Sequence, residues 1–224
     1  MNFMKTNWVD IECDGKIYNS LRDFGLAISN TDYIGQPVQN TSNIIFVPGS
    51  SKPLDLTDAT FGSQPFQYRP ISIHFGGIED PKEWDMRISM IRNLFEGKKV
   101  KLYFWTEQDW YWTGRVQITE FAHKRALGEF NFEIPFADPF KYKDIEIDVT
   151  STAQGITVDC PSCRMPVIPT ITTSAAITVG FGTYTKQLAA GTHKDTNIKF
   201  TDCVNTLSLT GAASVTIKYA EGSL

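Results

Sequence analysis

The chain has 224 residues, room for one large domain or two modest ones, and its 42% hydrophobic content can build a packed core. Its apolar runs, such as residues 44–47 and 102–105, are far shorter than the roughly 20 residues that a membrane-spanning helix needs. A net charge of −4 without a long basic run argues against a surface dedicated to nucleic-acid phosphates. Because residues 1–16 mix charges into their apolar residues, we expect no secretion signal and a protein made and kept in the cytoplasm unless it is exported within a larger assembly.

Charged residues are concentrated in the first two thirds of the chain. Residues 1–148 hold 37 of the 46 Lys, Arg, Asp and Glu residues, and all five tryptophans. Residues 149–224 are instead rich in Thr, Ser, Ala and Gly. Such a shift marks a domain boundary, which we place just after Asp138-Pro139, so that the domains are residues 1–142 and 143–224.

Two segments of the first domain precede its helix. Residues 30–43 hold few apolar side chains among Gly, Pro, Asn, Gln and Thr, which predicts an arm or protruding connection. Residues 70–75 predict a strand that ends at Gly76-Gly77 and leads into the helix.

One amphipathic helix is predicted between residues 80 and 97. Asp80 is a favourable N-cap, Pro81 suits the first helical position and Glu83 completes a capping box. Gly97 is typical of a left-handed residue that ends a helix. The apolar stripe that should pack on a sheet consists of Trp84, Ile88, Ile91, Leu94 and Phe95.

The rest of the first domain is predicted to be strands. Residues 100–105 and 110–121 flank residues 106–109 as a hairpin, residues 126–128 close the next turn, and residues 129–134 alternate polar and apolar. Trp110 and Trp112 share one sheet face and Tyr111 the other. Whether one set of these rings is exposed or packs beneath the helix stays open at this point.

The second domain shows no helical period. Residues 170–219 read as short strands broken at Gly180, Gly182, Gly191 and Gly211, which predicts a small antiparallel β-sandwich. The chain as a whole is therefore expected to be mainly β.

Cys160-Pro161-Ser162-Cys163 is the motif with the clearest chemical character. Pro166 and Pro169 prevent the helix that a redox Cys pair needs, while Cys13 and Cys203 are isolated in the sequence. Structural thiols are the favoured interpretation, with a disulfide or a metal or redox site as alternatives.

Hydrolytic motifs are absent from the sequence. The carboxylate pairs Asp55/Asp58 and Glu107/Asp109 fit solvated turns, and His74 fits a structural position in a strand. We expect no enzyme, no cofactor and no metal site.

Several segments resemble the distal tail proteins of long non-contractile-tailed phages (siphophages) and their prophage relatives. The similarity covers most of the chain, in order and at similar spacing. It is carried by residues 47–57 with their Leu-Asp-Leu-Thr, 68–71, 91–101, 110–116, 138–142, 205–207 and 215–224.

The resemblance implies an N-terminal β-barrel with one helix, related to tail-tube proteins, and a C-terminal galectin-like β-sandwich. It implies a hexameric ring, the distal tail hub, that joins the tail tube to the tail tip and host-adhesion apparatus. The implied partners are the major tail tube protein, a tail-tip or tail-associated protein and a receptor-binding protein, with no membrane. DNA would pass through the ring without specific binding, and the protein would be part of the virion tail, assembled in the host bacterial cytoplasm.

Turn position and expected exposure suggest which residues contact neighbouring subunits. The candidates lie in the 30–43 segment, along the 98–101 edge and at the 107–111 hairpin tip: Asn30, Gln36, Asn40, Lys98, Lys99, Lys101, Glu107, Asp109, Trp110 and Tyr111. Six chains at −4 give a ring of 6 × −4 = −24, which would repel DNA phosphates if the acids face the channel.

A carbohydrate-binding module that touches the host cell wall is the alternative function. Galectin-like folds often bind sugars, although a fold does not confer a function. Residues 149–224 supply few rings for a stacking platform: Phe181, Tyr184, Phe200 and Tyr219.

Overall fold

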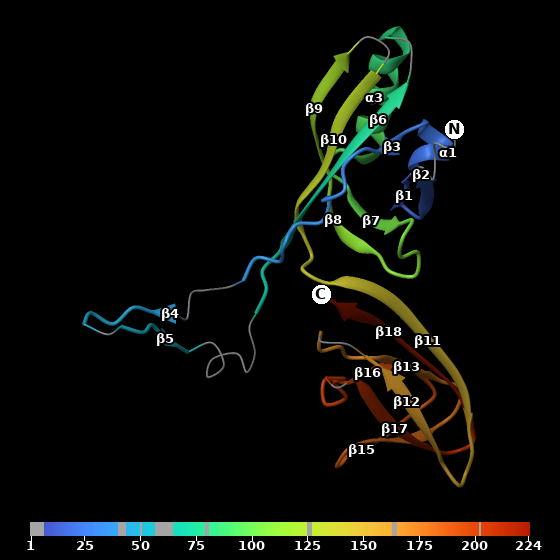
Figure 1. The fold of residues 1–224 in the computed structure, drawn as a ribbon. Coiled ribbons are helices and arrows are strands. Elements are labelled where there is room, and N and C mark those ends of the chain that lie inside the picture. The colour runs from blue at the N-terminus through green and yellow to red at the C-terminus, as the bar shows by residue number, and fades with distance from the viewer. Residues whose placement is uncertain are drawn as a thin grey trace. The chain divides into compact units, whose positions relative to one another are not determined.

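The computed structural model describes residues 7–39, 44–49, 51–56, 65–78, 81–124, 127–162, 165–201 and 203–224. The chain is mainly β, as expected, and divides into two compact units, Met1–Pro139 and Phe140–Leu224 (Figure 1). Within the described residues, no helix is long and apolar enough to cross a membrane.

Unit 1 contains two four-stranded sheets and two helices among its described residues. One sheet has the order β2-β1-β7-β8 and the other the order β3-β6-β10-β9, and neighbouring strands in both are antiparallel. The elements are β1 (Val9–Cys13), β2 (Lys16–Asn19), α1 (Ser20–Phe24), β3 (Ala27–Ile28), β6 (Arg69–Ile78), α3 (Pro81–Phe95), β7 (Lys99–Phe104), β8 (Trp112–Arg115), β9 (Gln117–Lys124) and β10 (Leu127–Ala137).

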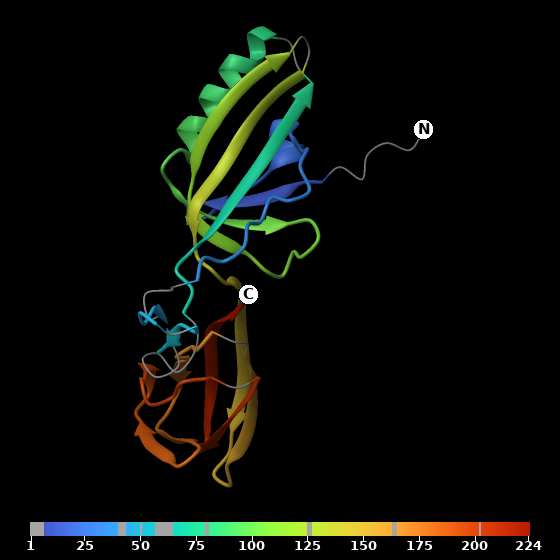
Figure 2. The ribbon, with the colours of Figure 1, turned by 60° about the vertical axis from the view of Figure 1, so that its left-hand side comes forward.

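The predicted helix is confirmed, although Asp80 lies outside the described residues. The predicted hairpin is confirmed for β7 and β8, but the single strand expected over residues 110–121 is wrong: it breaks at Val116 into β8 and β9, which belong to different sheets. Helix α3 runs alongside the long strands of unit 1 (Figure 2), and Gly97, just after it, has a φ of 71°. The short helix α1 was not predicted; Asn19 caps it by accepting from the Leu21 and Arg22 backbone N–H groups.

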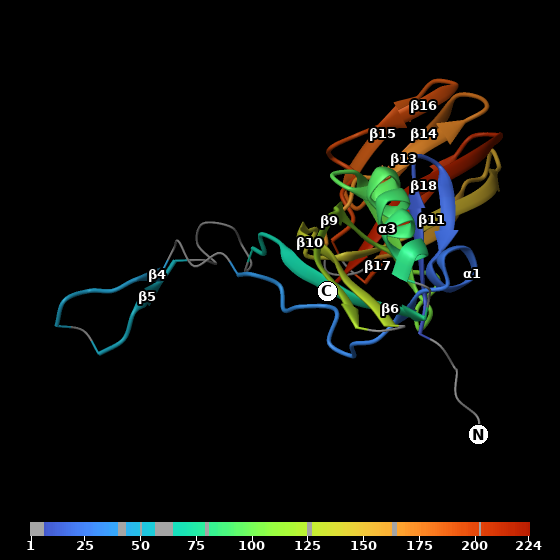
Figure 3. The same cartoon turned by 90° about the horizontal axis from the view of Figure 1, so that it is seen from above.

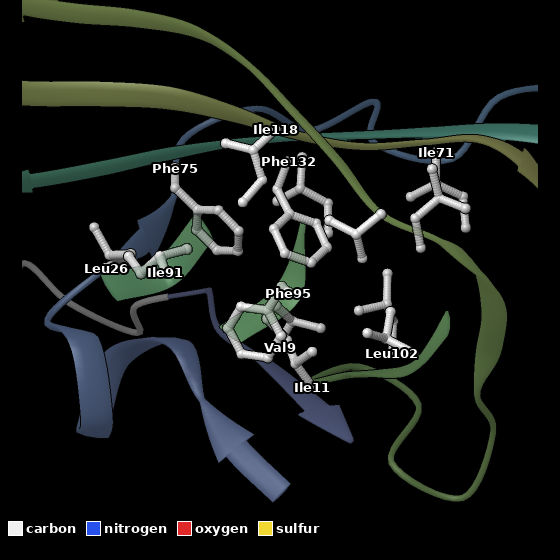
Figure 4. Close-up of a cluster of buried hydrophobic side chains, with 14 of the residues drawn as sticks. Val9, Ile11, Leu26, Ile71, Phe75, Ile91, Phe95, Leu102, Ile118 and Phe132 are labelled. Atoms are coloured by element: carbon white, nitrogen blue, oxygen red, sulfur yellow. The ribbon is translucent and has the colours of Figure 1, made fainter. Parts of the chain in front are cut away.

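The core of unit 1 is built from the inward faces of both sheets and the apolar stripe of α3 (Figure 4). Phe95 packs edge-to-face against Phe132, and Trp84 lies next to Phe130. Gly128 is essential to this packing, because a Cβ there would lie 2.3 Å from the Trp84 ring. The prediction of a turn over residues 126–128 is wrong for Leu127 and Gly128, because both already belong to β10.

Two further expectations for unit 1 are corrected. Strand β6 does not end at Gly76-Gly77 but continues through both to Ile78, because Gly77 allows Leu26 to approach closely: a Cβ there would lie 3.1 Å from the Leu26 Cδ2 atom. The described part of the 30–43 segment, residues 30–39, runs along β6 rather than protruding. Its backbone pairs through Gly35 N–H to Pro70 O at 2.8 Å and Ser72 N–H to Tyr33 O at 2.9 Å.

A separate hairpin lies between this segment and β6. Strands β4 (Ile44–Ile45) and β5 (Leu54–Asp55) pair with each other and with no other described strand. Figure 3 shows the hairpin extending away from the other sheets of its unit. It contributes no residue to the buried core of unit 1.

Unit 2 is a β-sandwich of two four-stranded sheets, ordered β11-β18-β13-β16 and β12-β17-β14-β15. The core of unit 2, a second apolar cluster of the chain, lies between these two sheets and includes Val179, Phe200, Leu207 and Ile217. The strands are β11 (Lys141–Ser151), β12 (Ile156–Pro161), β13 (Thr170–Thr173), β14 (Ile177–Phe181), β15 (Tyr184–Leu188), β16 (Gly191–Lys194), β17 (Val204–Thr210) and β18 (Ala213–Ser223).

Of the four glycines expected to break the strands of unit 2, Gly180 does not. It lies inside β14, opposite Ser208 of β17, and a Cβ at this position would lie 2.3 Å from the Ser208 Oγ atom. A glycine in a strand can thus mark a close cross-strand approach rather than a turn.

Candidate functional site: surfaces for assembly

The β4–β5 hairpin carries the densest exposed apolar surface of the described chain. Four of the nine exposed large apolar side chains belong to it: Ile45, Phe46, Val47 and Leu54. Phe46 is 80% exposed. Exposed apolar groups gathered on one element are typical of an interaction surface, which makes this hairpin a candidate contact site.

The sequence alone does not predict this hairpin as a contact site, although it contains a signal for the hairpin itself. The apolar run 44–47 is followed by Pro48-Gly49 and Pro53, which is typical of two short strands around a turn. A run of this length is consistent with a buried strand as much as with an exposed one, so the sequence alone does not distinguish them.

The outward face of sheet β2-β1-β7-β8 brings together two of the predicted contact residues, Lys101 and Tyr111. The Lys101 ammonium lies 4.4 Å from the centre of the Tyr111 ring and 3.6 Å from a Glu12 carboxylate oxygen. The Tyr103 hydroxyl donates to the same carboxylate at 3.0 Å. Lys101 and Tyr111 thus already have partners within their own chain.

Lys98 and Lys99, on the same 98–101 edge, differ in how accessible their side chains are. Lys98 donates to Asp14 at 2.7 Å, and this hydrogen-bonded ion pair raises the pKa of Lys98 and lowers that of Asp14. Lys99 is exposed on β7. Lys99 is therefore the more accessible of these two lysines.

At the hairpin tip, Glu107 and Asp109 are exposed and Trp110 is half-buried, whereas Tyr111 is only 8% exposed. Trp112 belongs to the core, and the Arg69 guanidinium stacks 4.7 Å from its ring centre. Two of the three adjacent rings therefore pack within the chain instead of forming an open aromatic platform.

Two of the three candidate contact residues in the 30–43 segment lie within the described part of the chain. The Asn30 side chain donates to Ser72 O at 2.9 Å and accepts from His74 N–H at 3.0 Å, so it extends the pairing along β6. Gln36 is exposed, and Asn40 lies outside the described residues.

The outward face of sheet β3-β6-β10-β9 is polar and acidic. Its central strand β10 presents Glu129, Asn131 and Glu133, which alternate with the buried Phe130, Phe132 and Ile134. Their cross-strand neighbours on β6 are Gly76, His74 and Ser72. Two carboxylates thus lie on this face, and their described neighbours on β6 add no Lys or Arg.

The cysteine motif shows no reactive geometry in its described part. Cys160 is fully buried on β12, and burial raises the pKa of its thiol to about 11. Cys13 and Cys203 are free thiols, the first buried and the second exposed, and Cys163 lies outside the described residues. Over the described ranges, no three potential metal-ligating His, Cys, Asp or Glu residues cluster.

The aromatic rings of unit 2 are engaged in its interior. Phe200 and Tyr219 are buried and pack edge-to-face, and the Tyr219 hydroxyl donates to Pro161 O at 2.5 Å. Phe181 and Tyr184 are partly buried against the same core. Unit 2 thus offers no fully exposed ring, within the described part, on which a sugar could stack.

Comparison with known proteins gives one informative result. No family model matches the chain, and no curated protein matches it. Among solved structures, the Dit protein of phage SPP1, described as a paradigm of hub adsorption apparatus in phages that infect Gram-positive bacteria, is similar with a TM-score of 0.66 and 14% identity. The match covers 96% of this chain and 99% of that one, so the two proteins share a fold over both units.

Proposed function

We propose that the chain is a structural protein of a siphophage virion tail, a distal tail hub within the adsorption apparatus, with no catalytic role. The observation that carries this proposal is the fold shared with SPP1 Dit across nearly the full length of both chains. The sequence segments that resemble distal tail proteins support the same role.

We further propose that unit 1 forms a hexameric ring. The exposed apolar residues of the β4–β5 hairpin, Phe46 above all, require a cover that the described core of unit 1 does not give them. In a ring, the next copy supplies that cover by burying the hairpin against its own surface. Gln36, Lys99, Glu107 and Asp109 are exposed and stay candidates for the same contact, together with Asn30, Asn40, Lys98, Lys101, Trp110 and Tyr111.

The polar face of sheet β3-β6-β10-β9 is our candidate for the surface of the DNA channel. Glu129 and Glu133 on β10 place negative charge there, and the described side chains beside them on β6 add no Lys or Arg. Carboxylates facing DNA phosphates repel them, which lets DNA pass without binding. The hub would join the major tail tube protein to a tail-tip or tail-associated protein and a receptor-binding protein, and it would be assembled in the host bacterial cytoplasm.

Light scattering of the purified protein, with negative-stain images of the same sample, tests this proposal. Six copies of the 25.2 kDa chain predict a mass of about 151 kDa and ring-shaped particles. A monomer that keeps its mass over a hundredfold concentration range would contradict self-assembly into a ring.

A further inference from the structure

Strand β11 forms a long edge of unit 2 that no described strand pairs with on its outer side. All eleven of its residues pair with β18, from Lys141 opposite Ser223 to Ser151 opposite Ala213, and β11 ends the sheet order (Figure 1). In an antiparallel ladder, half of the backbone N–H and C=O groups of an edge strand point away from the sheet. Between Ile145 and Thr150, these outward groups have no backbone partner among the described residues.

The side chains of this edge carry a regular charge pattern. Asp144, Glu146 and Asp148 are exposed on one face, while Ile145, Ile147 and Val149 point to the core and are only partly buried. Glu146 lies 2.7 Å from Lys218 with both side chains more than half exposed, so this pair is weak and open to exchange.

A hollow lies beside the same strand. It has a volume of about 400 Å³ and is lined by Asp144, Ile145, Glu146, Lys218 and Tyr219. Glu146 and Lys218 lie on the exposed face of the sheet, whereas Ile145 and Tyr219 face the core. The hollow therefore marks the open surface beside the Glu146–Lys218 ion pair, where an incoming Lys or Arg would compete with Lys218 for the carboxylate.

The charge pattern disfavours a second copy as the occupant in the central registers. Antiparallel self-pairing of β11 about Ile147 would set Glu146 opposite Asp148 of the other copy at two places, and pairing about Ile145 would set Asp144 opposite Glu146. Like charges directly opposite each other on paired strands are destabilising. The same acidic row is complementary to a strand that carries Lys or Arg at alternate positions.

We propose that the β11 edge of unit 2 docks an extended basic segment of another protein by β-strand addition, with Lys or Arg side chains of that segment beside Glu146 and Asp148. Backbone hydrogen bonds to the open edge supply affinity, and the acidic row supplies specificity. This goes beyond the tail-hub function and does not depend on ring formation, so its test separates from the test of that function.

The experiment measures binding of a fluorescently labelled peptide, Lys-Val-Lys-Thr-Lys-Val-Lys-Thr-Lys, to the full chain by anisotropy at 150 mM salt. Two control peptides accompany it, one with every Lys replaced by Glu and one with the central Lys replaced by Pro. The proposal expects the basic peptide to bind, the Glu peptide not to bind, and the Pro peptide to bind at least tenfold more weakly, because proline cannot continue the ladder.

Variants of the chain locate the site. Glu146→Lys with Asp148→Lys should abolish binding of the basic peptide and create binding of the Glu peptide. Asp159→Lys is the matched control, since Asp159 lies on edge strand β12 and accepts from the Thr206 hydroxyl much as Asp148 accepts from that of Thr216. The milder pair Glu146→Gln with Asp148→Asn keeps the side-chain shapes should the charge reversal prevent folding; it should weaken binding at least fivefold.

Three results would overturn the proposal: no binding of the basic peptide, equal binding of the Pro peptide, or unchanged binding to the Glu146/Asp148 variants. The second would indicate nonspecific attraction of charge instead of strand addition. The third would place the binding elsewhere on the chain.

Discussion

The two units have the same core arrangement but differ in the groups that they expose at their surfaces. Each packs two four-stranded sheets around one apolar cluster. Unit 1 adds a helix to that core and extends a hairpin whose large apolar residues are exposed, Phe46 by 80%. Among its described residues, unit 2 exposes one large apolar side chain, Val204, and ends in a charged strand edge. From this difference we propose that unit 1 makes apolar contacts and unit 2 makes contacts directed by charge.

The largest expected effect on stability comes from adding one methyl group to the core of unit 1, compared with the same addition in unit 2. Gly128→Ala in unit 1 forces a Cβ into the Trp84 ring, a rigid group held by the core, and should lower the unfolding free energy of unit 1 by roughly 3 kcal/mol. Gly180→Ala in unit 2 meets only the Ser208 hydroxyl, which can rotate away, and should cost less than about 1 kcal/mol.

Denaturant titration reads the two units separately. All five tryptophans lie in unit 1, so their fluorescence follows that unit alone, while far-UV circular dichroism follows both. Equal shifts of the fluorescence midpoint in the two variants would contradict the packing described for Trp84.

Charge reversal tests the outward face of sheet β3-β6-β10-β9, which we propose as the surface of the DNA channel. Glu129→Lys with Glu133→Lys should convert a ring that ignores DNA into one that retains it, with at least tenfold tighter binding that weakens steeply as salt rises. Glu83→Lys with Asp85→Lys on α3 makes the same change of charge at exposed positions away from that face. Gel-shift titration over 50–300 mM salt measures both; equal DNA retention by the two variants would remove the channel assignment.

In unit 2, an effect of pH on stability is expected from Asp195. Asp195 accepts from Lys186, Tyr184 and Asn197, and these hydrogen bonds, the one from Lys186 first, hold its pKa well below the ordinary 3.8. A carboxyl with a depressed folded pKa stabilises the fold above its unfolded pKa, and this stability is lost as pH falls through the folded value. Circular dichroism melts between pH 5 and pH 2 should therefore show a smaller acid loss in Asp195→Asn than in the wild type. The same acid slope in both proteins would contradict this role of Asp195.

The smallest effect concerns the thiols. Cys203 is exposed, whereas Cys160 is buried with its pKa raised to about 11, so its thiolate fraction near neutral pH is roughly a hundredfold below that of an ordinary thiol. Brief iodoacetamide treatment followed by peptide mass mapping should modify Cys203 and spare Cys160, with full labelling in denaturant as the control. Rapid modification of Cys160 would mean that β12 opens readily.

Patterns that repeat along one element were predictable from the sequence, and contacts between distant elements were not. The period of Trp84, Ile88, Ile91 and Phe95 gave α3, and the alternation of residues 129–134 gave the core of β10. The strand ends predicted at Gly77 and Gly180 were wrong, because each glycine lacks a side chain so that a residue far away in the sequence, Leu26 or Ser208, can approach closely. A glycine read locally suggests a turn.

The surfaces were harder to predict for the same reason. Residues 30–39 are polar as a loop would be, but their backbone and the Asn30 amide pair with β6, more than 30 residues later. Tyr111 stands at a hairpin tip, where exposure is normal, and is covered by Lys101 and Tyr103. Conversely, the apolar run 44–47 does not distinguish a buried strand from an exposed one, and three of its four residues are exposed.

The central claim is that unit 1 assembles through its apolar hairpin, and sedimentation velocity of two matched variants tests it directly. Phe46→Ser and Met86→Ser each remove one exposed apolar side chain, 80% and 70% exposed respectively, and neither belongs to the core. Our account predicts that Phe46→Ser sediments as a folded monomer at concentrations where the wild type and Met86→Ser sediment as hexamers. A Phe46→Ser protein with the same hexameric sedimentation coefficient as the wild type would contradict it.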